Sequence, residues 1–356
     1  MSKVRLGDVA IEVRETSKCP EGLPVVGLEH LLPSEITLTQ WSDTSDNTFN
    51  KLFHKGQILF GRRRAYLKKA AVAPFDGVCS GDITVIAAKP ERLLTELLPF
   101  IISNDAFFDY AMEKSAGSLS PRVKWAQLAE YEFDLPELEE QQKLANLLWA
   151  MERTRKAYQD LLIQADELVK SQFVEMFGDP ILTEKDETLT ALSDSCILKA
   201  GKFIKADDIS DTRQDGQYPC FGGNGIRGYV SQFNQEGERP LIGRQGALCG
   251  NVQYATGRFY ATEHAVVVTP KGNDINTLWL YYLLQHLKLE RYATGAAQPG
   301  IAVNKLEQIR VSIPGIMAQT RFSRFARETD KSKLAIRQAL ESLEKSRSAI
   351  MTKVFG

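Results

Sequence analysis

The chain repeats itself at half its length, and no other feature of the sequence constrains its fold as strongly. The segment AGSLSPRVKWAQLAEYEFDLP and the later segment TGAAQPGIAVNKLEQIRVSIP share their order of Gly, Pro and Leu, and their first matched glycines, Gly117 and Gly295, are 178 residues apart in a chain of 356. Further pairs at this offset are Leu128 and Leu306, Pro136 and Pro314, Gln141 and Gln319, and Phe177-Gly178 and Phe355-Gly356. Upstream, ILFGR (58–62) matches PLIGR (240–244) at an offset of 182. Two copies of one fold present two similar surfaces, so the repeat predicts a two-part target.

Each copy has the pattern of a mixed α/β domain followed by one long helix. In the first copy, the short runs QILFG, DITVIAA and YEFDLP are typical of strands, and residues 93–112 of a helix. Residues 138–177 contain neither Pro nor Gly, which predicts a helix of about 60 Å. The expected fold class is α+β, with the two long helices pairing as an antiparallel coiled coil. The expected boundaries are 1–137 and 191–315 for the globular domains, 138–178 and 316–356 for the helices, and 179–190 for a linker.

The spacing of apolar and small residues along these helices, alternately three and four, predicts a coiled-coil seam. Neither helix can bury such a stripe alone, so we expect them to pair and to hold the globular domains at opposite ends. The expected seam residues are Leu144, Leu147, Met151, Thr154, Tyr158, Leu161, Ala165 and Leu168 in the first helix, and Phe322, Phe325, Thr329, Ser332, Ile336, Ala339, Leu343 and Ser346 in the second.

Composition excludes several classes of protein. The five cysteines are scattered without a C-x-x-C spacing, which argues against a zinc site or a disulfide framework and favours a reducing compartment. The sequence has no apolar run long enough for a signal peptide or a membrane span. We therefore expect a cytoplasmic protein with no metal, no cofactor and no membrane partner.

The net charge of −1 conceals segregated blocks of charge. Residues 51–75 contain seven Lys or Arg and no acid, whereas residues 130–140 contain six acids and no base. Such blocks are compatible with one cationic and one anionic surface. For the acidic block, a solvated surface without a partner is the favoured interpretation.

The sequence GNGIRG at 223–228 matches the dinucleotide fingerprint G-x-G-x-x-G. That motif binds a cofactor only between a strand and a helix, and here the strand-like run YVSQF follows it. A glycine-rich β-turn that brings the backbone close to another group, such as DNA, is favoured. Motifs for nucleotide hydrolysis, adenine methylation and nuclease activity are absent, and the four histidines are isolated. The pattern predicts a chain without catalytic residues that binds and positions.

Two segments are the candidate DNA contacts. The run GRRRAYLKK (61–69) offers arginines that can meet guanine or phosphate, and GRQGA (243–247) retains the first arginine and adds a glutamine suited to adenine. A basic solvated hairpin is the alternative for the first run. For the Gly-Pro loops, which contain Ser118, Ser120, Arg122 and Lys124 in one copy and Gln298, Asn304 and Lys305 in the other, a structural turn remains equally open. The candidate DNA-binding residues are Arg62, Arg63, Arg64, Tyr66, Lys68, Lys69, Asn224, Arg227, Arg244 and Gln245.

The whole chain resembles the DNA-specificity subunit of type I restriction-modification systems. Residues 294–314 are similar to the family's hallmark at the end of a target recognition domain. YPCFGGNGIRGY (218–229) and LIGRQGALCGNVQY (241–254) resemble segments inside such a domain. LPELEEQQKLANLL (135–148) and FVEMFGDP (173–180) resemble the start and end of the central spacer helix. The first copy departs from the pattern, with SLSPRVKW where a Gln/Ile-Pro loop is typical.

The resemblance implies two target recognition domains that each read one part of a bipartite sequence in double-stranded DNA. It also implies that the helices dock two modification subunits that methylate adenine, and that restriction-translocase subunits join this core. Two alternatives remain: a coiled-coil scaffold that does not bind DNA, and a dinucleotide-binding enzyme.

Overall fold

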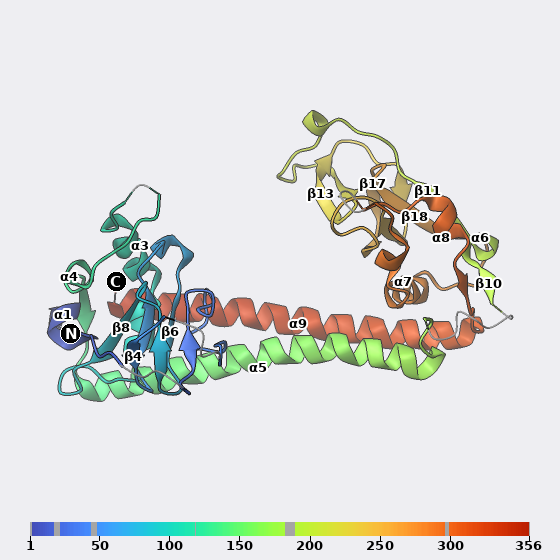
Figure 1. The fold of residues 1–356 in the computed structure, drawn as a ribbon. Helices are drawn as coiled ribbons and strands as arrows, with labels where there is room; N and C mark the ends of the chain where they lie inside the picture. The colour runs from blue at the N-terminus through green and yellow to red at the C-terminus, as the bar shows by residue number, and fades with distance from the viewer. Residues whose placement is uncertain are drawn as a thin grey trace. The chain divides into compact units, whose positions relative to one another are not determined.

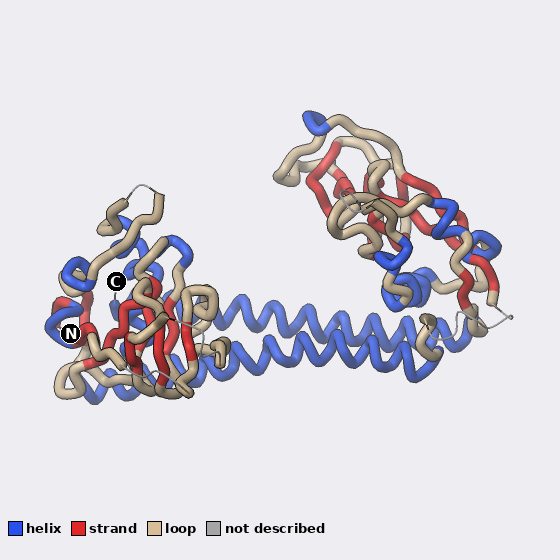
Figure 2. Tube along the Cα trace, in the orientation of Figure 1, coloured by secondary structure: helices blue, strands red, loops and turns tan. Residues whose placement is uncertain are grey.

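The computed structural model describes residues 2–17, 22–43, 48–117, 119–181, 189–295 and 299–355. The chain forms two compact units, shown as a ribbon in Figure 1 and by secondary structure in Figure 2. Unit 1 comprises Met1–Asp160 and Arg337–Gly356, and unit 2 comprises Leu161–Ile336. The expected linker at 179–190 falls largely outside the described residues.

Unit 1 is built on a four-stranded antiparallel sheet in the order β2-β8-β5-β6. Its central strands are rich in Ile, Val and Phe and are almost wholly buried, as expected for β-branched and aromatic residues inside a sheet. The strands are β2 (Ala10–Val13), β5 (Ile58–Gly61), β6 (Ala70–Val72) and β8 (Ile83–Ala88).

Two smaller sheets complete unit 1. One has the order β3-β7-β4, and in the other β1 pairs antiparallel with β9, so that the first and last strands of the unit meet. The strands are β1 (Ser2–Arg5), β3 (Val25–Val26), β4 (Lys51–Phe53), β7 (Gly77–Cys79) and β9 (Glu132–Leu135). The strands expected at QILFG, DITVIAA and YEFDLP are therefore confirmed as β5, β8 and β9.

The helical stretch expected near 93–112 is confirmed in part, because the structure has two helices there and begins them at Leu98. They are α2 (Leu98–Ile102) and α3 (Asp105–Glu113). Asn104 separates them: its side chain accepts a hydrogen bond from the backbone N–H of Ala106 at 3.3 Å and caps the start of α3. The other short helices of unit 1 are α1 (Leu6–Val9), η1 (Ala65–Leu67) and α4 (Trp125–Leu128).

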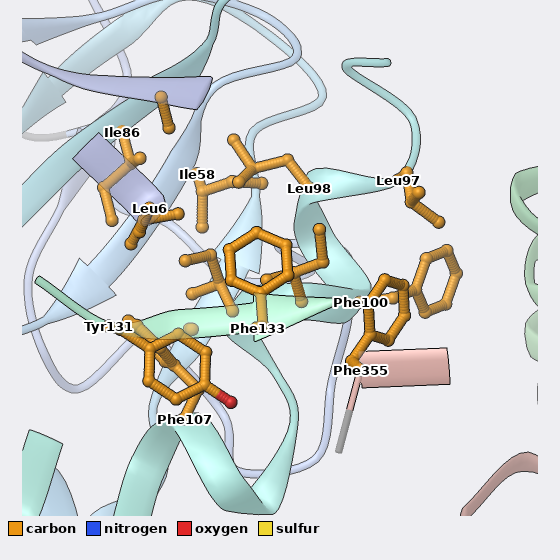
Figure 3. Close-up of a cluster of buried hydrophobic side chains, with 14 of the residues drawn as sticks. Leu6, Ile58, Ile86, Leu97, Leu98, Phe100, Phe107, Tyr131, Phe133 and Phe355 are labelled. Carbon is orange, nitrogen blue, oxygen red and sulfur yellow. The ribbon is translucent and has the colours of Figure 1, made fainter. Parts of the chain in front are cut away.

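The main core of unit 1 combines aromatic side chains from the helices and from β9. Figure 3 shows Leu6, Phe107, Tyr131 and Phe133 within this cluster of buried side chains, together with Phe100 and Phe355. The rings of Phe133 and Phe355 lie 6.2 Å apart between centroids. The last turn of the chain is therefore part of the core of the first copy.

Unit 2 repeats the four-stranded arrangement in the order β11-β18-β15-β16 and adds a second sheet in the order β13-β12-β17-β14. The strands of the first sheet are β11 (Cys196–Ala200), β15 (Arg239–Gly243), β16 (Val252–Ala255) and β18 (Ala265–Pro270). Those of the second are β12 (Tyr218–Gly222), β13 (Gly225–Val230), β14 (Gln235–Glu236) and β17 (Arg258–Ala261). A short pair joins β10 (Thr190–Ala191) to β19 (Arg310–Val311).

The helices of unit 2 correspond in part to those of unit 1. Helix α7 (Thr277–His286) is capped by Asn276. The side-chain oxygen of Asn276 accepts hydrogen bonds from the backbone N–H groups of Leu278 and Trp279. The helix carries the largest fully buried side chain, Trp279, into the core. The remaining helices are α6 (Leu192–Ser195), η2 (Ala206–Asp208), η3 (Leu289–Tyr292) and α8 (Val303–Glu307).

The two long helices are α5 (Leu138–Phe177) and α9 (Ile316–Phe355), each of 40 residues. In unit 1, Leu148 near the start of α5 shares a core with Met351 near the end of α9. In unit 2, Phe173 near the end of α5 packs on Phe322 near the start of α9, with ring centroids 5.3 Å apart. The contacts within each unit therefore confirm the antiparallel pairing.

Half of the expected seam of α5 is confirmed, because Leu144, Met151, Tyr158 and Ala165 are buried or half-buried, whereas the other four positions were wrong by one residue. Leu147, Leu161 and Leu168 are each about half exposed (46–53%), and Thr154 is exposed as well. The buried positions lie one residue further along, at Leu148, Arg155, Leu162 (half-buried) and Val169. In α9 the expected Ser332 and Ser346 are exposed, whereas Phe322 is buried and Ile336, Ala339 and Leu343 are half-buried.

A buried glutamine at the start of each long helix shows the repeat at atomic detail. The Gln141 amide accepts from the backbone N–H of Leu94 at 2.9 Å and donates to the carbonyls of Arg92 and Pro136. The Gln319 amide accepts from Asn276 N–H at 2.8 Å and donates to the carbonyls of Asp274 and Pro314. Both side chains are at most 1% exposed. We call these contacts glutamine clamp 1 and glutamine clamp 2.

We expect Gln141→Ala and Gln319→Ala each to lower the free energy of unfolding by about 2–4 kcal/mol, because each leaves buried backbone groups without partners. Urea unfolding of the full chain measures this. The control is Gln142→Ala, whose side chain is exposed and bonds only to Asn146, and which should change stability by about 0.5 kcal/mol or less. Equal effects of all three substitutions would contradict the role of the clamps.

Deleting residues 157–163 from α5 alone should destabilise the chain. The deletion shortens the helix by about 10 Å, so that α5 cannot keep its contacts with α9 in both units at once. A second deletion of residues 336–342 from α9 should restore much of the lost stability, since both helices then have the same length again. Thermal unfolding of the single and double deletions provides the comparison, and a double deletion less stable than either single one would contradict the matched register.

Candidate nucleic-acid interface

In unit 1 the arginine run and the Gly-Pro loop lie side by side. Arg62 accepts through its backbone carbonyl from Val123 N–H at 3.0 Å, and Arg64 donates its N–H to the carbonyl of Pro121 at 2.8 Å. Arg63 and Arg122 form an antiparallel bridge between these bonds. We call residues 62–64 and 120–123 loop pair 1. The sequence analysis singled out both segments without predicting that they are paired.

Unit 2 contains the same backbone arrangement. Ile301 N–H donates to the carbonyl of Arg244 at 2.9 Å, Gly246 N–H donates to the carbonyl of Pro299 at 3.0 Å, and Gln245 bridges to Gly300. Residues 244–246 and 299–301 form loop pair 2. The same backbone hydrogen bonds therefore recur in both loops, and the matched glycines Gly117 and Gly295 both have positive φ, whereas the side chains between the matched positions differ.

The side chains of loop pair 1 converge on one carboxylate, that of Asp82. Arg122 donates to it through Nε at 2.8 Å and through Nη2 at 3.3 Å, and Arg63 approaches through Nη1 at 3.4 Å. The Nε of Arg63 also donates to the hydroxyl of Ser120. The hydrogen bond from Arg122 lowers the pKa of Asp82 below its ordinary value, so the group is a carboxylate at neutral pH.

Loop pair 2 carries different groups in the corresponding places. The side chain of Gln245 is exposed and makes no hydrogen bond with any described residue. His264 stands at the position that corresponds to Asp82. The backbone carbonyl of His264 accepts a hydrogen bond from Arg244 N–H, and the backbone carbonyl of Asp82 likewise accepts one from Arg62 N–H. The ring of His264 lies 3.3 Å from a carboxylate oxygen of Glu263.

The glycine motif at 223–228 lies at the tip of a hairpin. Strands β12 and β13 pair antiparallel with Gly222 opposite Gly225, so a strand, not a helix, follows the first glycines. This arrangement does not provide the helix N-terminus on which dinucleotide binding depends. A Cβ atom on Gly243 would overlap the carbonyl oxygen of Gly223, which shows how closely the hairpin tip approaches loop pair 2.

The hairpin brings Asn224 and Arg227 into the candidate interface of unit 2. Asn224 is exposed and accepts a hydrogen bond from the Asn251 side-chain amide at 2.8 Å. Arg227 is exposed on β13 and has no hydrogen bond or ion pair with a described residue.

The basic block at 51–75 is acid-free in sequence but not in space. Lys51 lies 3.8 Å from Glu12, burial lowers its pKa, and its ammonium donates to the carbonyl of Ile83. Lys68 pairs with Asp105, and Lys69 donates to the carbonyl of Leu28. Tyr66, on η1, is 53% exposed. The structure therefore leaves Arg64 and Tyr66 without a side-chain partner among the described residues. Arg62 Nε is buried, and the charge of Arg62 contributes to the lowered pKa of Asp82.

A cavity of about 550 Å³ borders loop pair 1. Arg62, Arg122 and Lys124 line it together with Glu12, Arg14 and Trp125. Among the described residues there is no cluster of three or more potential metal ligands. The described helices also include none that is long and apolar enough to cross a membrane. Ser118 and Gln298 of the Gly-Pro loops lie outside the described residues.

Asp82 and Asn251 are the residues that sequence reasoning missed. Asp82 is 20 residues from the arginines, in the turn before β8, and nothing in its local sequence indicates a partner. The offset of 182 that relates Arg62 to Arg244 also relates Asp82 to His264. That correspondence was the one signal in the sequence that could have connected Asp82 with the arginine run.

Comparison with known proteins connects this geometry to one family. The family model described as "Type I restriction modification DNA specificity domain" matches the chain twice, at residues 3–164 and 185–345. The type I restriction enzyme EcoprrI specificity subunit of Escherichia coli is 45% identical over 148 residues, which cover 40% of this chain and 37% of that protein. A putative type I restriction enzyme specificity subunit of Haemophilus influenzae is 32% identical over 114 residues, covering 31% and 29%. These matches span well under two thirds of the length of either curated relative.

Two solved structures have a similar fold. The S subunit of a type I restriction-modification system from M. genitalium matches with a TM-score of 0.66 at 17% identity, covering 100% of this chain and 96% of that one. A chain from a structure of the type I R-M system matches with a TM-score of 0.60 at 19% identity, covering 99% and 97%. The expected α+β tandem repeat with paired long helices is confirmed.

The close approach of Gly243 and Gly223 generates a prediction. Gly243→Ala should lower the free energy of unfolding by about 3 kcal/mol or more, because backbone cannot move aside as a flexible side chain can. The matched control is Gly61→Ala, where the added Cβ would lie 3.1 Å from a methyl of Leu28 and 3.2 Å from the Lys69 carbonyl. We expect that change to cost about 1 kcal/mol. Urea unfolding of both variants decides, and an equally tolerated Gly243→Ala would refute the contact.

Proposed function

Because the chain belongs to the family of type I restriction-modification DNA specificity domains, we propose that it recognises a bipartite sequence in double-stranded DNA for such a system. Each unit reads one part of the target. The observation that carries the proposal is the repeated backbone geometry of the two loop pairs, which hold different polar side chains. The same backbone geometry with different side chains is suited to two domains that bind different base sequences.

The proposed recognition domains are residues 1–137 and 191–315, with spacer helices at 138–178 and 316–356 and a linker at 179–190. The proposed DNA contacts are Arg62, Arg63, Arg64, Tyr66, Lys68, Lys69, Asn224, Arg227, Arg244 and Gln245. Arg64 and Arg227 are the strongest candidates for phosphate contacts, since both are exposed and neither has an acidic partner among the described residues. Lys68 and Lys69 are weaker candidates, because the first is paired with Asp105 and the second donates to the carbonyl of Leu28.

We propose that the chain itself is not an enzyme and requires no cofactor. It positions two modification subunits that methylate adenine, and restriction-translocase subunits join them in the cytoplasm. The exposed leucines of α5 support a role in docking. Leu147, Leu161 and Leu168 are spaced by multiples of seven residues, so they share one face of the helix that α9 does not cover.

The triple substitution of Arg62, Arg63 and Arg64 by Ala should weaken DNA binding. It should also flatten the dependence of log affinity on log salt by ~0.9 for each phosphate that the variant no longer binds. The measurement is a titration of labelled double-stranded DNA with the full chain at several salt concentrations, and a thermal melt checks that the variant is folded.

The control for this experiment removes the same charge from other surfaces of unit 1. It combines Lys3→Ala, Arg92→Ala and Lys143→Ala, three exposed cations outside loop pair 1. We expect this variant to retain the salt dependence of the wild type. If both triple variants lose affinity equally, loop pair 1 is not the DNA contact.

A further inference from the structure

The shared carboxylate of loop pair 1 fixes the orientation of one guanidinium group. Arg122 meets Asp82 side-on, with Nε and Nη2 directed at the two carboxylate oxygens. A guanidinium is planar and has five N–H donors, so this contact leaves the outer N–H groups of Nη1 and Nη2 free as a parallel fork. The Arg122 side chain makes no other hydrogen bond with a described residue.

That free fork matches one base better than the others. Guanine presents the acceptors O6 and N7 side by side in the major groove, and a bidentate arginine is the commonest specific contact to it. The hydrogen bonds to Asp82 already order Arg122 in the free protein, so binding need not order it again.

Asp82 also argues against a phosphate as the ligand of Arg122. The carboxylate offsets one of the two positive charges of Arg63 and Arg122, so it weakens their attraction for a phosphate, whereas a neutral base edge with two acceptors depends less on net charge. Asp82 is only 20% exposed at its side chain and is contacted by both arginines, so its position is fixed. Arg64 and Lys124, which have no acidic partner among the described residues, suit the adjacent phosphates.

The loop that carries Arg122 is accessible. Leu119, at its tip, is 92% exposed, and Figure 1 shows this teal loop on the side of unit 1 away from α5 and α9. Loop pair 2 cannot make the same contact, because Gly300 corresponds to Arg122, Gln245 to Arg63 and His264 to Asp82.

We propose that Arg122, oriented by Asp82, reads a guanine in the part of the target bound by unit 1. Asp82 is a positioning residue, since it acts through Arg122. This inference rests on the proposed function and adds to it a residue pair and a base. It also distinguishes the two units, because unit 2 binds its part of the target without an arginine that a carboxylate orients.

The test is selection by the full chain from a randomised pool of double-stranded DNA, followed by competition binding with duplexes that replace each selected base. The variants are Arg122→Lys and Asp82→Asn, and the control is Asp76→Asn. Asp76 is another carboxylate of unit 1, which pairs with His54, so this control removes the same charge outside loop pair 1. Circular dichroism melts establish that the variants are folded, and Asp82→Asn keeps the shape of the native side chain.

We expect the wild type to prefer guanine at one position by about 5- to 150-fold over the other bases. Arg122→Lys should abolish that preference, and Asp82→Asn should reduce it while total DNA affinity at low salt increases, because one negative charge is gone. Asp76→Asn should leave the preference intact, and no variant should change the bases selected in the other part of the target. A merely structural role of Asp82 would not separate discrimination from affinity in this way.

Two results would overturn the inference and are distinguishable. If the wild type selects a bipartite sequence but both variants keep every guanine preference, Arg122 does not read a base, and the proposed function stands. If the wild type enriches no sequence and its DNA binding does not depend on salt, the proposed function fails and this inference fails with it.

Discussion

A single buried amide joins the globular part of each unit to the long helix that follows it. Gln141, in the first turn of α5, bonds to Arg92 and Leu94 in the segment before α2 and to the carbonyl of Pro136, which directly follows β9. Helix α4 and strand β9 occupy the residues between loop pair 1 and this clamp. The clamp therefore anchors the segment that connects loop pair 1 to α5. Its three hydrogen bonds are internal, and such bonds are costly to leave unmade in a buried site.

The repeat made much of this fold predictable. Residues that recur at a fixed offset, such as Gln141 and Gln319, do so because both copies need the same donors and acceptors in the same places. The long helices were predictable from the absence of Pro and Gly, and three strands of unit 1 from their β-branched runs. The pairing of the arginine run with the Gly-Pro loop was not, because the two segments are nearly 60 residues apart and the bonds between them are made by backbone.

The seam of α5 was mispredicted for a physical reason. Sequence reasoning followed the leucines, whereas the buried stripe includes Gln141, Glu152 and Arg155. These polar groups are tolerated inside because they are paired: Arg155 bonds to Glu152 and also to Glu35 in unit 1. A hydrophobic pattern cannot reveal a buried ion pair, since its members look like surface residues. The displaced leucines are instead left on an uncovered face of the helix.

The charge pattern of the sequence was misleading for a related reason, because it does not show which cations pair with acids in the folded chain. A block without acids in sequence acquires Glu12, Asp82 and Asp105 in space, so several of its cations are already neutralised. The two loop pairs differ in the side chains at a few matched positions, Arg63 and Arg122 against Gln245 and Gly300, and therefore also in positive charge. Because backbone hydrogen bonds hold both loops, a change at a tip alters what the loop can bind without altering how it folds. The same backbone geometry can therefore present a guanidinium group suited to guanine in one copy and an amide in the other. Binding two unlike half-sites requires such a difference between the copies.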